Sequence, residues 1–94
     1  MKGLRLILFL AAMMAVVPMA AADKLSELRQ KADALHAGGK NDSALIVARE
    51  ALDMATKSRN TTAIVGINSS MGVYLRTMGK TDEALRHYNE AMKL

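Results

Sequence analysis

Gly-Lys-Asn-Asp-Ser-Ala-Leu, residues 39–45, recurs as Gly-Lys-Thr-Asp-Glu-Ala-Leu at residues 79–85. The two stretches are 40 residues apart and differ at two of their seven positions. A fixed period of this size is typical of chains built from repeated pairs of helices. The sequence therefore predicts two copies of one structural unit.

The residues on either side of this stretch have the spacing of amphipathic helices. Apolar side chains recur every three or four residues, which places them on one helix face. We expect helices over about residues 24–37, 42–57 and 62–78, and a fourth from residue 81 onward. No alternating run of β-branched residues predicts a strand. The expected fold class is all-α.

Turn and cap residues separate the expected helices. Gly39 and Gly79 are expected to close a helix end in the left-handed conformation that glycine tolerates. Asn41 or Asp42 is expected to cap the second helix, and Thr81 the fourth. These signals predict short connections, and therefore antiparallel neighbouring helices.

The two copies resemble the tetratricopeptide repeat. This family pairs two antiparallel helices, with small residues where the helices approach closely and large residues in the adjoining spaces. The residues that carry the resemblance are Ala32, Leu35, Gly39, Ala44 and Ala51 in the first copy and Gly72, Leu75, Gly79, Ala84, Tyr88 and Ala91 in the second. The resemblance implies helix pairs stacked as a short right-handed α-solenoid, with repeat one over about 24–59 and repeat two over about 62–94.

Several positions depart from the family's pattern. Leu28 and Asn68 stand where the family has an aromatic near the start of the first helix. Ala48 replaces the second-helix aromatic in the first copy, and Thr56 replaces the closing Pro. The period also exceeds the usual value of about 34 residues. Longer repeats of this kind are similar to those of bacterial signalling proteins, including exported arrays that precede a membrane helix and a kinase.

Residues 1–22 have a different composition from the rest of the chain. Lys2 and Arg5 precede the uncharged apolar stretch Leu6–Val17, and small residues follow at Ala20–Ala22. This order of parts is the pattern of a secretory signal peptide. We therefore expect an exported protein, periplasmic or secreted. The alternative is an uncleaved segment that anchors the chain to a membrane.

Charge and motif content argue against several function classes. The formal net charge is +4, Lys2 and Arg5 contribute two of these charges, and the other basic residues are scattered, so no nucleic-acid binding is expected. The chain has no cysteine. His36 and His87 lack metal-binding or catalytic spacing and are expected to face solvent. No phosphate loop, dinucleotide fingerprint or nucleophile elbow occurs. We expect no enzyme activity, no cofactor and no metal.

The expected function is the binding of a protein or peptide partner. An α-solenoid of this type presents the first helix of each repeat on a concave surface. Carrying the family's groove positions over gives Ser26, Arg29, Asp33 and His36 in the first copy and Ser69, Val73, Arg76 and Thr77 in the second. Arg29 and Arg76 are the strongest candidates, because a guanidinium group can hold a carboxylate or backbone oxygens.

Two features leave alternatives open. The apolar face of the last helix continues to Leu94 without a covering helix, whereas repeat arrays need about three or more repeats and polar terminal faces. We therefore expect either the N-terminal piece of a longer array or self-association through the last helix. The alternative function is the periplasmic input region of a membrane receptor such as a histidine kinase. Gly66, inside an expected helix, has no explanation at this level.

Overall fold

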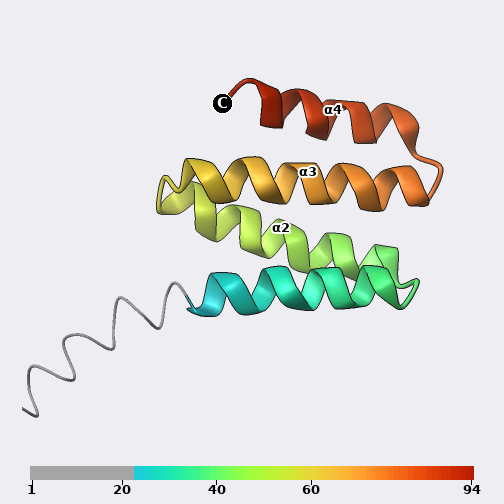
Figure 1. Cartoon of the computed structure of the whole chain (residues 1–94), viewed down its shortest axis with the longest axis horizontal. Helices are drawn as coiled ribbons and strands as arrows, with labels where there is room; N and C mark the ends of the chain where they lie inside the picture. The colour runs from blue at the N-terminus through green and yellow to red at the C-terminus, as the bar shows by residue number, and fades with distance from the viewer. Residues whose placement is uncertain (1–22) are drawn as a thin grey trace, which may run out of the picture.

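The computed structural model describes residues 23–94, and these residues form only helices and short turns. The helices are the first helix (residues 23–37), α2 (Asn41–Lys57), α3 (Thr61–Thr77) and α4 (Thr81–Met92). The chain reverses direction at each turn (Figure 1). The predicted all-α class is confirmed for this part of the chain. The expected signal segment lies outside the described residues.

The three turns share one backbone conformation at 20-residue intervals. Gly39, Arg59 and Gly79 all have positive φ, at 79°, 54° and 80°. In each turn the residue after this one donates its N–H to a carbonyl five residues earlier, which is the Schellman closure of a helix end. These bonds are Lys40 to Leu35 at 2.8 Å, Asn60 to Ala55 at 2.9 Å and Lys80 to Leu75 at 2.9 Å. The predicted role of both glycines is confirmed.

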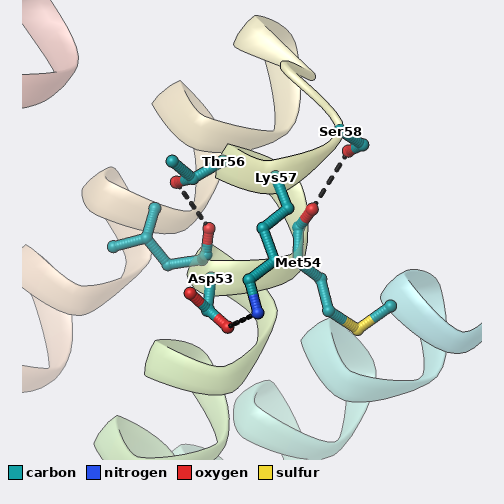
Figure 2. Close-up of polar contacts among 6 residues, drawn as sticks. Asp53, Met54, Thr56, Lys57 and Ser58 are labelled. Atoms are coloured by element: carbon teal, nitrogen blue, oxygen red, sulfur yellow. Dashed lines mark hydrogen bonds and ion pairs between the residues drawn. The ribbon is translucent and has the colours of Figure 1, made fainter.

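The end of α2 reaches this conformation without a glycine. Arg59 occupies the left-handed position, where a side chain costs about 1–2 kcal/mol. Figure 2 shows the side chains that support this end. Thr56 Oγ1 donates to the Leu52 carbonyl at 2.7 Å, and Ser58 Oγ donates to the Met54 carbonyl at 3.1 Å. Both hydroxyls therefore bond back to carbonyls one helical turn earlier, and the Met54 carbonyl also accepts the Ser58 backbone N–H at 3.1 Å.

The expected side-chain caps of α2 and α4 are wrong. The N-cap residues are Lys40 and Lys80, and neither side chain makes a capping bond. Because each Schellman turn ends at that lysine, the next helix begins at once, and Asn41 and Thr81 are already its first residues. Of α2, α3 and α4, only α3 has a side-chain cap: the Ala63 N–H donates to Asn60 Oδ1 at 3.1 Å.

The core of the described residues is centred on α3. The largest fully buried side chains are Ile67, Met71, Tyr74 and Leu75, and all four belong to this helix. Burying a side chain of this size contributes about 1.5–3 kcal/mol. Helix α3 contacts both α2 and α4, whereas α2 and α4 do not contact each other. Neighbours in the chain therefore pack against each other among α2, α3 and α4, and α3 also contacts the first helix.

Small residues set how closely the helices approach. The buried face of α2 consists of Ala44, Leu45, Ala48, Ala51 and Ala55. The residues of the repeat pattern that are buried are Ala32, Ala44, Ala51, Gly72, Leu75, Ala84 and Ala91, while Leu35 and Tyr88 are half-buried. On α4, Ala84 and Ala91 are buried, whereas Leu85 and Met92 of the expected apolar face are exposed, because no described helix covers them.

Candidate binding groove between the first helix and α3

Three predicted binding residues line one side of the first helix and meet α3. Arg29, Asp33 and His36 are spaced by four and three residues, so they lie along one helix face. Asp33 and His36 both contact Tyr74 of α3. Arg29 lies against Gly66 of the same helix. The first helices of the two repeats are therefore joined along a line of polar contacts.

Tyr74 is the central residue of this line. Its side chain is only 2% exposed, and its hydroxyl donates a short hydrogen bond to the Asp33 carboxylate. The His36 ring lies over it, with 4.8 Å between ring centroids. Burial and the hydrogen bond to Asp33 raise the pKa of the Tyr74 hydroxyl. Tyr74 therefore remains a neutral donor and holds Asp33 in position.

The absence of a side chain at Gly66 makes room for Arg29. A Cβ at Gly66 would lie 2.5 Å from Nη2 of Arg29 and 3.4 Å from Cζ. The guanidinium group therefore rests on the backbone of α3. Gly66 leaves room for this contact, although a glycine inside a helix costs about 1 kcal/mol relative to Ala.

An open hollow of about 440 Å³ lies beside Arg29, between the first helix and the start of α3. Its lining residues are Leu25, Ser26, Arg29, Gln30, Asp33, Asn60, Thr62 and Ala63. Its volume is within the range of sites that hold small ligands or a few peptide residues. Most lining residues are polar, and they offer both hydrogen-bond donors and acceptors. The hollow can accept an extended polar chain.

A second hollow, deeper between the helices, has a volume of about 10 Å³. Its walls include Arg29, Asp33, Ser70 and Tyr74. This volume holds at most about one water molecule. The inner end of the groove is therefore closed by packed side chains, and only its outer part is open.

The predicted residues of α3 are not part of this hollow. Ser69 Oγ donates to the Val65 carbonyl at 2.9 Å, and Thr77 Oγ1 donates to the Val73 carbonyl at 2.9 Å. Val73 is half-buried and Arg76 is exposed. The structure therefore brings together Ser26, Arg29 and Asp33 at the hollow, whereas the four residues predicted on α3 line neither hollow.

Sequence reasoning missed the α3 residues that face the first helix, Ser70 and Tyr74. They lie one helical turn apart from each other and from Gly66, so a single face of α3 carries all three. The signal that could have found Tyr74 is its spacing from Ile67 and Met71, which continues the buried face of α3. Asn60 and Thr62 also line the hollow; the sequence indicated only a link at Asn60 and the start of a helix at Thr62.

The expectation that both histidines face solvent is wrong. His36 Nδ1 lies 2.6 Å from Asn41 Oδ1, and His87 Nδ1 lies 3.0 Å from Oδ1 of the buried Asn68. Burial lowers the pKa of His87, and the nearby charges of Arg49 and Arg86 lower it further. Each histidine therefore joins two neighbouring helices.

Residues 23–94 contain no group of three or more acidic, histidine or cysteine side chains that could hold a metal ion.

None of the described helices has the length and apolar character needed to cross a membrane. Comparison with protein-family models, with curated proteins and with solved structures gives no match to this chain.

Proposed function

We propose that the chain is an exported, non-enzymatic interaction module of the tetratricopeptide type, and that it binds an extended peptide segment of a partner protein. The open hollow beside Arg29 carries this proposal. Main-chain amides of an extended peptide need donors and acceptors, and the hollow offers Ser26, Gln30 and Asn60 at its wall. Residues 1–22 would direct the protein out of the cytoplasm.

The arrangement of the repeats supports the same proposal. The three turns recur at 20-residue intervals with one closure, and the sequence recurs at 40. Helices that stack by regular repetition are the architecture of α-solenoids, whose grooves bind extended partners. In this interpretation the first helix and α3 are the groove helices, and α2 and α4 are the outer helices.

Arg29 is the residue on which binding is expected to depend most. Its guanidinium rests on Gly66, so the side chain is held before a ligand arrives, and it borders both hollows. A positioned guanidinium donates two parallel hydrogen bonds to a carboxylate or to backbone oxygens. A ligand that carries an acidic side chain or a free carboxyl end would therefore be preferred.

The test uses peptides selected from a random library on the full chain. Arg29→Ala should weaken their affinity by about tenfold or more, as loss of a charge-assisted hydrogen bond does. Lys31→Ala is the matched control, because it removes one positive charge from the exposed side of the same helix. Equal affinities for the Arg29→Ala and Lys31→Ala variants would contradict the proposal.

A further inference from the structure

The internal repeat identifies an uncovered surface at the C-terminal end of the stack. Leu45 and Leu85 are equivalent residues 40 positions apart, yet Leu45 is 5% exposed and Leu85 is 53% exposed. Helix α3 packs against α2, whereas no described helix follows α4. Leu85, the half-buried Tyr88 and Met92 form a line along α4, which we call the α4 surface. Met92 is 77% exposed, and the Tyr88 ring also packs on Gly72 of α3.

The opposite end of the stack has a polar outer face. The α3 residues Ile67, Met71 and Tyr74 are buried, and their equivalents in the first helix are Glu27, Lys31 and Ala34. These three equivalents are all exposed. A second copy that stacked its first helix on α4 would therefore take the charged groups of Glu27 and Lys31 out of water, which is costly even if the two pair with each other. Head-to-tail stacking of two copies is disfavoured.

The remaining self-contact is a two-fold one. We propose that a second copy of this chain covers the α4 surface, with the two α4 helices packed antiparallel. An isologous contact uses the same surface on both copies and closes after two subunits. In this arrangement Leu85 of one copy lies near Met92 of the other, and Tyr88 lies near the axis.

The charges beside the α4 surface suit this orientation. Asp82, Arg86, Asn89 and Lys93 are spaced by four, three and four residues, so they form one line along α4. Asp82 begins this line and Lys93 ends it. Antiparallel packing places Asp82 of one copy beside Lys93 of the other at both ends of the contact, and parallel packing would oppose like charges. The antiparallel helix dipoles also attract each other.

The absence of cysteine in the natural chain allows a direct test with single-cysteine variants of the full chain. Asn89→Cys places a thiol near the proposed axis, and Ser43→Cys places one on the exposed start of α2. Mild oxidation should give at least tenfold more disulfide-linked dimer for Asn89→Cys. Equal yields would mean nonspecific association, for example through residues 1–22, and would overturn the proposal.

Two further comparisons separate the α4 surface from other contacts. Met92→Asp in the Asn89→Cys chain should abolish the linked dimer, whereas Ile46→Asp should not. Ile46 is a matched control, because it is an apolar residue on α2 with 67% exposure. Circular dichroism should show unchanged helicity in both variants. Retention of the dimer in Met92→Asp would overturn the proposal.

Charge reversal tests the orientation. Asp82→Lys alone and Lys93→Asp alone should each lower the yield of linked dimer, and the double variant should restore it.

A chain with Glu27→Cys mixed with the Asn89→Cys chain should give little mixed disulfide. Predominance of that mixed disulfide would show head-to-tail stacking and would contradict the two-fold contact.

Discussion

The ring of Tyr88 lies directly on the backbone of Gly72: a Cβ at Gly72 would be 2.5 Å from Cε1 of the ring. The equivalent residues of the first copy are Ala32 and Ala48, both buried. One copy therefore fills the space between its helices with two methyl groups, and the other fills it with a ring and no side chain. The two positions change together because they share one volume.

Gly72→Ala is expected to destabilise the fold by about 1–2 kcal/mol. The added methyl group forces the Tyr88 ring away, and this overpacking outweighs the gain in helix propensity. Gly72→Ala combined with Tyr88→Ala reproduces the pair found in the first copy. The double variant should lose less stability than the sum of the single losses. Urea unfolding followed by circular dichroism measures this difference, and strict additivity would contradict the shared volume.

Arg59→Gly is expected to stabilise the fold by about 1 kcal/mol, because glycine removes the cost of a side chain in the left-handed conformation. Gly39→Ala and Gly79→Ala should each destabilise it by about the same amount. A change of this size shifts the melting temperature by about 4–8 °C in a domain of this length. A lower melting temperature for Arg59→Gly would show that Arg59 makes stabilising contacts that the turn geometry does not reveal.

His87 is expected to make stability depend on pH. Its pKa in the folded state is below the ordinary value of 6.5, so the unfolded state binds the proton more readily. The contribution of neutral His87 to the free energy of unfolding is therefore present above the ordinary pKa. It is lost as the pH falls through the lowered pKa of the folded state. His87→Gln keeps a donor for Asn68 and removes the titration. The stability difference between wild type and this variant should therefore shrink or reverse from pH 7.5 to pH 5. A stability difference between the two chains that does not change with pH would contradict the lowered pKa of His87.

Tyr74→Phe is expected to cost about 1–2 kcal/mol, because it removes a hydrogen bond to the Asp33 carboxylate. The pKa of Tyr74 is shifted upward in the folded state, whereas the pKa of His87 is shifted downward. The stabilisation is complete below the ordinary tyrosine pKa of 10.0 and is lost as the pH rises above it. Unfolding measured at pH 8 and pH 10.5 should show this alkaline loss in wild type and less of it in Tyr74→Phe. An equal alkaline loss in both chains would mean that the hydroxyl is accessible to solvent.

Gly66→Ala separates stability from binding. Arg29 is the flexible end of a long side chain and can move away from an added methyl group, while alanine improves helix propensity by about 1 kcal/mol. The variant should therefore be as stable as wild type or more stable. Peptide affinity should nevertheless fall, because Arg29 loses its support. Unchanged affinity would show that the contact with Gly66 has no part in binding.

The helices of the described residues were predictable because the sequence repeats and because each turn has a strong local signal. Gly39 and Gly79 mark two turns directly. The turn at Arg59 has no such residue, and only the break between the expected helices 42–57 and 62–78 indicates it in the sequence. The cap residues were wrong because the residue that ends each Schellman turn is also the N-cap of the next helix. This residue is lysine at positions 40 and 80, whose side chain cannot accept a hydrogen bond, whereas Asn60 at the equivalent position caps α3.

The candidate site was less predictable, because it depends on which face of α3 meets the first helix. Helix periodicity identifies a buried face but does not show how neighbouring helices rotate against each other. Ser69 and Ser70 are adjacent in sequence, and only Ser70 lines the inner hollow. The hydrogen bond between His87 and Asn68 also joins two different helices, so the sequence around either residue does not predict it.

Photo-cross-linking shows whether a bound peptide lies in the groove between the first helix and α3. A photoreactive amino acid is placed in the full chain at Gln30, inside the hollow, at Glu50 on α2, or at Asn89 beside the α4 surface. A peptide selected on the wild-type chain is then added and the sample is irradiated. If the peptide binds in the groove, it should cross-link from position 30 and little from positions 50 and 89. Cross-linking mainly from position 50 or 89 would contradict the claim that the groove between the first helix and α3 binds the partner.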